Sequence, residues 1–273
     1  MTGLTGKDIL TMIDGIAPFE LAEGWDNSGL QAGDLTWPVD KILISLDITL
    51  PVMEEARAWG ADLVLSHHPL IMDARKTIDF DTMPGSAILI AAQEKITILS
   101  AHTNLDKALN GLNDHFAAMI GLRGLSPLYP EPGSSDREEG VFGLGRIGDL
   151  EKGICFQDLV GDIKNRLDLH RVRVIGDLNE TVARVAVCTG SGGSLIKEFL
   201  QSSADLYITG DLKYHDARQI QEGGKSALDV GHFASEIIAV DLLTQKLEQA
   251  GRDLGHRMEI KGFNQEKDPF IIV

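Results

Sequence analysis

The sequence predicts an α/β fold of two related domains, with mostly parallel sheets and a metal site between the domains at the carboxyl ends of the strands. Short apolar runs rich in β-branched residues alternate with amphipathic stretches, which is the pattern of βαβ units. The chain has 273 residues, enough for two separate cores. A stretch rich in Pro, Gly, Ser and charged residues lies near its middle and favours a division there.

The first half of the chain alternates strands and helices. Pro51 near the start of the first of these helices fits the preference of proline for a first helical turn. Apolar, β-branched runs predict the strands. We expect strands over 41–49, 62–66 and 96–101, and helices over 51–59 and 86–95.

The second half repeats this rhythm of strand and helix. Its apolar runs predict strands over 183–189, 205–209 and 226–230, with helices between them and a final helix over 233–248. The segments 258–264 and 269–273 could close the sheet.

The best candidate for a domain boundary is YPEPGSSDREEG, residues 129–140. We therefore expect a first α/β domain over 1–128, a linker over 129–140 and a second α/β domain over 141–273.

Charge and cysteine content limit the possible partners and location. The chain carries 25 Lys and Arg against 41 Asp and Glu, a net charge of −16, which disfavours nucleic acid as a partner. Cys155 and Cys188 are isolated in apolar runs, as is typical of reduced thiols. The chain shows neither a secretion signal nor a membrane span. These features predict a cytoplasmic protein.

Two clusters of polar residues directly follow predicted strands. SHHPL places His67 and His68 at the end of one strand, and AHTNLD places His102 and Asp106 after the next. Ligands of open α/β sheets bind at these carboxyl ends. Taken alone, the first motif could be a pair of loop histidines and the second a helix N-cap.

A third cluster, DVGHFASE, lies where a strand passes into a helix. His232 and Glu236 are four residues apart, so they share one helical face, and Gly231 gives the backbone freedom at the turn. The alternative is a surface histidine and glutamate in a first helical turn.

The three clusters occupy equivalent places, so they can converge on one site. Together they offer three histidines and two carboxylates, more than one tetrahedral ion requires. Such a mixed set fits two ions about 3.5–4 Å apart. The predicted ligands are His67, His68, Asp106, His232 and Glu236.

Two further segments are candidate walls of a substrate pocket. GWDNSGLQAGD contains Trp25, Asp26 and Asn27, and ITGDLKYHDA contains Asp211 and His215. An ordinary turn explains Asp26 and Asn27 as well, and His215 could be a solvated histidine at a helix start.

The chain resembles the NIF-three-like family of dinuclear-metal proteins, whose bacterial members are often called GTP cyclohydrolase I type 2 homologues. The family's successive blocks match in order over nearly the whole chain. They are GWDNSGLQAGD, SHHPL, AHTNLD, GLGRIGDL, VAVCTGSGGSLI, ITGDLKYHDA and DVGHFASE.

This resemblance implies a metal-dependent hydrolase that opens the imidazole ring of a guanine nucleotide and releases formate. The metal pattern of the family falls on the five ligands named above, and we expect Glu236 to bridge the two ions. His102 or His215 would move protons. The resemblance also implies a homohexamer.

Other readings of the same ligands remain open. Two ions could also serve a phosphoester hydrolase, and the protein could instead be a non-catalytic metal-binding or metal-delivery assembly or an interaction scaffold. Histidine and carboxylate ligands accept zinc, manganese, iron, nickel or cobalt, so the residues do not identify the metal.

Overall fold

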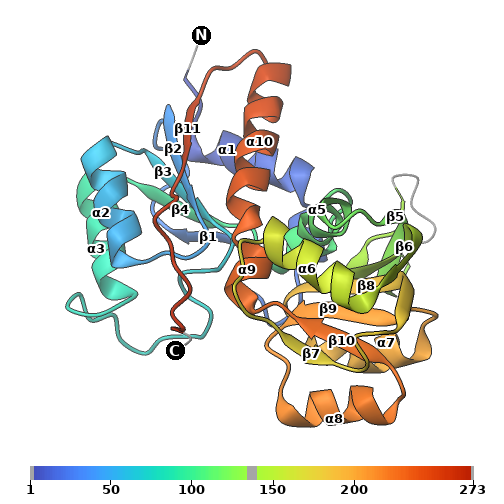
Figure 1. Cartoon of the computed structure of the whole chain (residues 1–273). Coiled ribbons are helices and arrows are strands. Elements are labelled where there is room, and N and C mark those ends of the chain that lie inside the picture. The colour runs from blue at the N-terminus through green and yellow to red at the C-terminus, as the bar shows by residue number, and fades with distance from the viewer. Residues whose placement is uncertain (1–2, 134–139, 272–273) are drawn as a thin grey trace. The chain divides into compact units, whose positions relative to one another are not determined.

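The computed structural model describes residues 3–133 and 140–271. The chain forms two compact units, each made of two chain segments. The first unit contains residues 1–105 and 239–267, and the second contains residues 106–238 and 268–273. Figure 1 shows the elements along the chain.

The first unit is built on a five-stranded sheet in the order β1-β4-β3-β2-β11. The four strands β4, β3, β2 and β11 are parallel, and β1 is antiparallel to β4 at the edge. The strands are β1 (Gly29–Ala32), β2 (Lys41–Ser45), β3 (Leu63–Ser66), β4 (Thr97–Ser100) and β11 (Glu259–Gly262).

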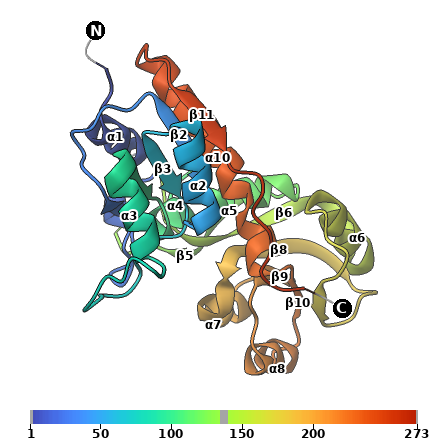
Figure 2. The ribbon, with the colours of Figure 1, turned by 90° about the vertical axis from the view of Figure 1, so that its left-hand side faces the viewer.

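Helices cover both faces of this sheet (Figures 1 and 2). Alternate side chains of a strand point to opposite faces. Leu43, Val64 and Ile98 pack in one core with residues of α2 and α3. The other face is covered by α1 and α10 (Figure 1). These helices are α1 (Gly6–Ile16), α2 (Leu50–Trp59), α3 (Gly85–Glu94) and α10 (Ile238–Asp253).

The second unit is built on a six-stranded mixed sheet in the order β5-β6-β8-β9-β10-β7. Its central strands β8, β9 and β10 are parallel, and antiparallel strands flank them on both sides. The strands are β5 (Arg123–Pro130), β6 (Gly143–Cys155), β7 (Arg173–Ile175), β8 (Thr181–Ser191), β9 (Leu206–Gly210) and β10 (Ser226–Asp229).

Two separate cores lie on the two faces of this sheet. Val185 and Val187 of β8 pack with α5 and α6, whereas the intervening Ala186 packs with α7 and α8. This alternation is what a strand buried on both faces requires. The helices are α5 (Leu112–Met119), α6 (Phe156–Arg166), α7 (Ile196–Gln201) and α8 (Tyr214–Glu222).

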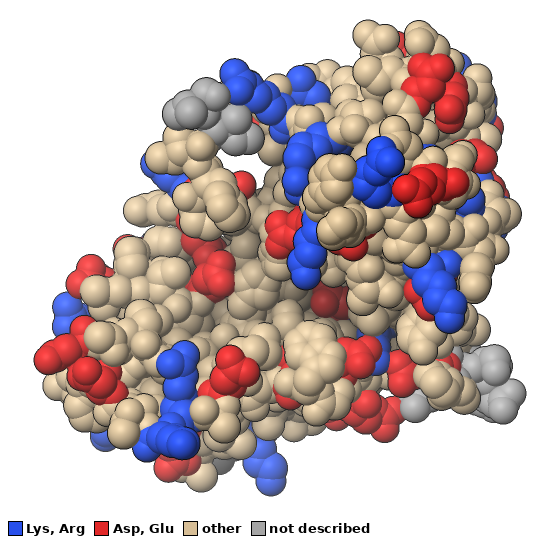
Figure 3. All heavy atoms as spheres, turned by 90° about the horizontal axis from the view of Figure 1, so that it is seen from below, with Lys and Arg blue, Asp and Glu red and all other residues tan. Residues whose placement is uncertain are grey.

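Short helical segments complete the chain. They are η1 (Phe19–Leu21), α4 (Thr103–Lys107), η3 (Gly192–Leu195) and α9 (His232–Glu236). In the described part of the chain, no helix combines the length and apolar character that crossing a membrane requires. Figure 3 shows acidic and basic side chains intermixed on the face that it displays.

The predicted α/β fold class is confirmed: the described residues form two sheets packed with helices, and five of the nine strand pairs described are parallel. The predicted strands of 62–66, 205–209 and 226–230 each lie within one residue of an observed strand. The strand expected over 41–49 ends at Ser45. The single helix expected over 233–248 is instead α9 followed by α10.

The observed units divide the chain at points other than the expected boundary. Residues 239–267 belong to the first unit, because β11 hydrogen-bonds in parallel with β2. Residues 134–139 of the expected linker lie outside the described residues, and the strands on either side of it, β5 and β6, pair with each other. Within 269–273, the described residues 269–271 form no strand.

A capping box fixes the start of α1. The side chain of Thr5 accepts a hydrogen bond from the backbone N–H of Asp8, and the carboxylate of Asp8 accepts one from the backbone N–H of Thr5 at 2.8 Å. The side-chain and backbone hydrogen bonds from Thr5 lower the pKa of Asp8. Together the two residues satisfy donors that a helix start leaves open.

We expect Thr5→Ala to lower the free energy of unfolding by about 1 kcal/mol.

Ionised Asp8 stabilises the folded chain at pH values above its ordinary pKa of 3.8. This contribution is lost as the pH falls through the lowered pKa that Asp8 has in the folded chain. Asp8→Ala should therefore shift the urea midpoint at pH 7 more than at pH 3. Glu54→Ala on α2 is the control; an equal pH-dependent shift in that variant would contradict the assignment to the cap.

Candidate metal centre

The first unit gathers three histidines at the carboxyl edge of its sheet. Ser45, Ser66 and Ser100 end β2, β3 and β4 and lie directly opposite one another in the parallel register. The two residues after Ser66 are His67 and His68, and the second after Ser100 is His102. The strand ends therefore bring together residues that are 34 positions apart in the chain.

The imidazole rings of these three histidines are mutual neighbours. Their ring centroids lie 5.1 to 5.5 Å apart. One ligand atom from each of the three lies within 4.8 Å of those of the other two. This separation suits ligands around a metal, so His67, His68 and His102 could hold an ion. The geometry alone is compatible with His102 as a ligand or as a neighbouring proton carrier.

Each of these histidines has its Nδ1 atom within hydrogen-bond distance of an oxygen. For His67 the partner is the carbonyl oxygen of Ala101 at 2.8 Å. A carbonyl only accepts, so Nδ1 of His67 carries the proton and Nε2 is the nitrogen suited to a metal. The Nδ1 atom of His68 lies 2.9 Å from Oδ1 of Asp47.

The third anchor is the most elaborate, since Asp26 holds His102 from a fully buried side chain. Its Oδ1 lies 2.8 Å from Nδ1 of His102, and its Oδ2 accepts hydrogen bonds from Ser28 and from Thr103. Burial alone would raise the pKa of Asp26, but these hydrogen bonds outweigh it and hold the pKa well below its usual range. The carboxylate is therefore ionised and keeps His102 in one orientation.

A carboxylate from the C-terminal segment supports Asp47. Both oxygens of Glu266 accept backbone hydrogen bonds at 2.8 Å, one from Leu46 and one from Asp47. Burial raises the pKa of Glu266, and the two N–H donors partly offset this effect. Glu266 thereby fixes the loop from which Asp47 reaches His68.

The second unit gathers the remaining predicted ligands at the carboxyl edge of its own parallel strands. His232 and Glu236 lie on α9, directly after β10, and Nε2 of His232 is 2.8 Å from Oε2 of Glu236. Nδ1 of His232 lies 2.8 Å from Oδ2 of Asp211, which follows β9. Asp211 has a φ of 57°, an uncommon conformation for a residue other than glycine.

Asp106 also faces this part of the second unit. Burial, together with the charges of Asp106 and Glu236, raises the pKa of the Cys188 thiol to about 12. Asn113 donates to the backbone oxygen of Asp106 at 3.1 Å and accepts from the backbone N–H of Thr189. Asp106 is therefore tied to the end of β8, the strand that carries Cys188.

Buried Arg146 stabilises the turn that follows Asp106. Its guanidinium binds both carboxylate oxygens of Asp114 and donates to the backbone oxygens of Lys107 and Ala108. It is only 1% exposed, so its charge has to be compensated by these partners.

The structure places His215, the other candidate proton carrier, at the exposed start of α8. Its ring meets that of Tyr214 edge-on, with centroids 5.4 Å apart. Among the described residues, the groups with clustered ligand atoms do not include His215. Of the predicted pocket walls, Trp25 is 64% exposed, and the centroid of its ring lies 6.1 Å from that of His102.

Two supporting residues escaped the sequence analysis. Asp47 is the second residue after β2 in the same way that His68 is the second residue after β3, so the rule of polar strand ends could have found it. The strand expected over 41–49 included Asp47, so this residue was not recognised as one that follows a strand. Glu266 gives no local signal, because it is separated from Asp47 by 219 positions.

The comparison with known families and proteins agrees with these motifs. The model of the Duf34/NIF3 family (NGG1p interacting factor 3) matches residues 4–269. The chain belongs to this family. A relative from Clostridium perfringens, named GTP cyclohydrolase 1 type 2 homolog, is 36% identical over 98% of this chain and 99% of its own. A Helicobacter pylori protein named GTP cyclohydrolase 1 type 2 is 34% identical over 84% of this chain and 86% of its own.

Solved structures share the fold along nearly the whole chain. A Bacillus cereus protein related to NIF3 matches with a TM-score of 0.93 and 25% identity, covering 100% of both chains. Reduced HcgD from Methanocaldococcus jannaschii matches with a TM-score of 0.79 and 30% identity, covering 97% of this chain and 99% of its own. The predicted family resemblance is therefore confirmed.

Close packing around Glu236 leads to a testable prediction. Gly190 has a φ of 64°, and a Cβ atom there would lie 2.0 Å from Oε1 of Glu236. Gly190→Ala should displace this carboxylate and lower metal affinity at least tenfold, on the scale of a lost supporting contact. Isothermal titration with zinc or manganese would measure the change.

Gly224→Ala is the matched control for this substitution. Gly224 has a φ of 68°, but a Cβ atom there would meet nothing within 4 Å. Both variants carry the same backbone strain and only one crowds Glu236. Equal metal affinity in the two variants would contradict the role assigned to Gly190.

Proposed function

We propose that this protein binds two divalent metal ions per chain and acts as a metal-dependent hydrolase of the GTP cyclohydrolase type. The proposed ligands are His67, His68, Asp106, His232 and Glu236, with Glu236 as the bridge. The proposal rests above all on the anchoring of the histidines.

Four histidines share one arrangement, in which Nδ1 lies 2.8 or 2.9 Å from an oxygen: Ala101 for His67, Asp47 for His68, Asp26 for His102 and Asp211 for His232. Metal-binding histidines of proteins almost always have their second nitrogen held in this way. It selects one tautomer and one ring orientation before a metal arrives. A random placement of histidines on the surface would not produce four of them at strand ends, each with its Nδ1 atom held in this way.

Two of the proposed ligands lie close to the points where the chain passes from one unit to the other. The chain passes from the first unit to the second between Leu105 and Asp106, and returns between Ile238 and Ala239. His102 and Asp106 are four residues apart, which corresponds to about 14 Å of fully extended chain at most. Glu236 is two residues before Ile238. Asp106 and Glu236 thus each lie within three residues of a crossing.

When bound, two divalent ions lower the pKa of water and polarise substrate oxygens. Nitrogen and carboxylate donors suit zinc, manganese, iron, nickel or cobalt. In our proposal His102, held by Asp26, moves a proton or orients a water molecule, and His215 is a second candidate for proton transfer. The substrate would be a guanine nucleotide, whose imidazole ring is opened with release of formate, following the names of the relatives.

Product analysis tests the reaction. Incubation of metal-loaded protein with GTP should release formate, measured by an enzyme-coupled assay. Release of inorganic phosphate instead would indicate a phosphoester hydrolase. The absence of both products with a fully metal-loaded protein would favour a non-catalytic metal-binding or metal-delivery role.

We further propose a homohexamer, which light scattering in solution would test against the mass of 29.6 kDa per chain.

The proposed bridge predicts unequal effects of ligand substitutions. Wild-type protein should hold about two ions per chain after reconstitution. Glu236→Gln should weaken the binding of both ions, because a bridging carboxylate contacts each of them. His67→Ala or His68→Ala should mainly weaken the binding of one ion. Elemental analysis of dialysed protein measures the content, with Glu248→Gln as a control outside the site. Equal losses from all three site variants would argue against Glu236 as the bridge.

The role of His102 is tested by metal content and turnover together. Because five other ligands are proposed, His102→Ala should retain near-normal metal content while turnover falls about 10²- to 10⁴-fold. His256→Ala serves as the histidine control. Loss of metal from His102→Ala would make His102 a ligand, and loss of neither property would make it a structural histidine.

A further inference from the structure

A cavity of about 300 Å³ lies beside His68 within the first unit. Its lining includes Asp47, which binds Nδ1 of His68 at 2.9 Å, and Pro69, the residue that follows His68. The cavity therefore adjoins the histidine cluster at the carboxyl edge of the sheet, where ligands of parallel sheets bind.

The wall of this cavity is largely apolar. Ile48, Leu50, Leu70 and Met83 line it. Leu50 is 42% exposed and Met83 is 40% exposed, so both present apolar surface to solvent at the cavity. Holding a metal ion does not require such a wall, whereas small-molecule sites typically combine apolar walls with a few polar groups.

Arg75 supplies a positive charge to the same cavity. Within residues 3–133 and 140–271, it makes no hydrogen bond or ion pair with another side chain or backbone group. The planar guanidinium offers five donors that match a carboxylate or phosphate. In a chain with a net charge of −16, a cation without a protein partner at a cavity favours an anion as its partner.

Asp47 is the opposing charge on the cavity lining. Its carboxylate is engaged with Nδ1 of His68, and its backbone N–H donates to Glu266. Asp47 is therefore held toward the histidine, which leaves Arg75 as the group suited to an oxyanion.

We propose that this cavity is a substrate-binding site for an organic oxyanion with an apolar body, such as the flat face of a nucleotide's ring. The oxyanion, a phosphate or a carboxylate, binds Arg75, and the apolar body packs against Leu50 and Met83. This inference rests on the proposed function in one respect: the bound molecule is a substrate only if the neighbouring His68 belongs to the metal centre.

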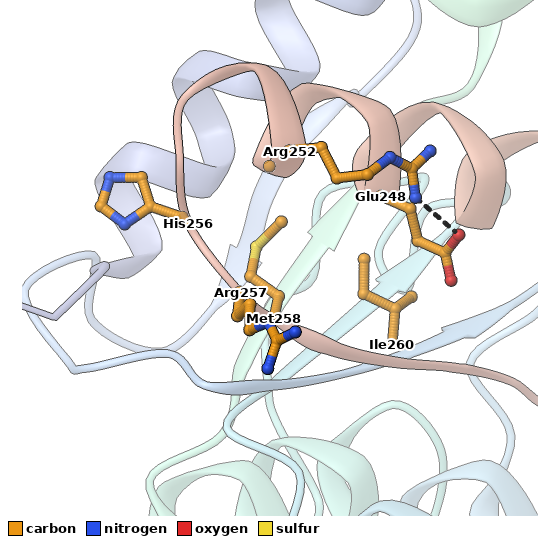
Figure 4. Close-up of a pocket in the computed structure, with 7 residues that line it drawn as sticks. Glu248, Arg252, His256, Arg257, Met258 and Ile260 are labelled. Carbon is orange, nitrogen blue, oxygen red and sulfur yellow. Dashed lines mark hydrogen bonds and ion pairs between the residues drawn. The ribbon is translucent and has the colours of Figure 1, made fainter.

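A second cavity of the same unit does not share these features. It has a volume of about 190 Å³ and lies where α10 ends and β11 begins (Figure 4). There Arg252 already pairs with Glu248 at 3.5 Å. Because β11 begins opposite Lys41, the first residue of β2, this cavity lies at the amino edge of the sheet, away from the histidines.

Binding of small probes to the full chain tests the proposal. Phenyl phosphate, benzoate and inorganic phosphate are titrated into protein labelled with ¹³C at its methionine methyl groups, both metal-loaded and metal-free. The methyl signal of Met83, assigned with Met83→Leu, should shift with phenyl phosphate or benzoate. Tighter binding of phenyl phosphate identifies a phosphate site, and tighter binding of benzoate identifies a carboxylate site.

Substitutions separate the charge from the apolar wall. Arg75→Ala should lower the affinity for the preferred probe roughly ten- to a hundredfold, which is the range for a lost hydrogen bond to a charged group. Lys76→Ala, at the next exposed position but outside the cavity lining, should leave binding unchanged. Leu50→Ser should lower the affinity for the aromatic probe but not the affinity for inorganic phosphate.

Three results would overturn the proposal: no shift of Met83 with either aromatic probe, equal affinity for the aromatic probes and inorganic phosphate, or equal losses in Arg75→Ala and Lys76→Ala. Elemental analysis of the same samples keeps the two ideas apart. Two ions per chain without probe binding rejects the cavity alone. Probe binding by a protein that retains no ions after reconstitution supports the cavity as a binding site and rejects the metal centre.

Discussion

The site depends on one constraint: parallel strands paired in register end together at one edge of a sheet. In the first unit the row Ser45, Ser66 and Ser100 sets this edge, and the residues just beyond it are those that anchor or form the histidine cluster. In the second unit the parallel strands β9 and β10 end in the same way, before Asp211 and His232. A polar residue one or two positions after such a strand lies at the common edge because of the strand pairing alone.

Placing polar groups at these edges has a cost that the surrounding structure offsets. Asp26 is fully buried and receives hydrogen bonds from four residues, which keep it ionised. Arg146 is compensated by Asp114 and backbone carbonyls. Cys188 is the opposite case, since burial and nearby carboxylates keep its thiol protonated.

Small residues allow the elements of the second unit to approach closely. A Cβ atom on Gly210 would lie 2.7 Å from the backbone of Gly231 and His232. Ser235 bridges the same region, since its hydroxyl accepts from the N–H of Gly190 and donates to backbone oxygens at the start of α9. Gly190 and Gly210 thus allow close packing around Glu236 and His232.

The sequence by itself determined the α/β class, the central parallel strands and the strand-end positions of the candidate ligands, because these follow from local periodicity and from residues a few positions apart. Only the tertiary structure decided the anchors and the division into units. Asp47 and the carbonyl of Ala101 contact the histidines, and Glu266 contacts the backbone of Asp47, through strand pairings that no local pattern encodes. Likewise, residues 239–267 join the first unit because β11 completes the parallel sheet beside β2. Contacts of this kind depend on which distant strand gains most from burial and hydrogen bonding, and that is a property of the folded chain as a whole.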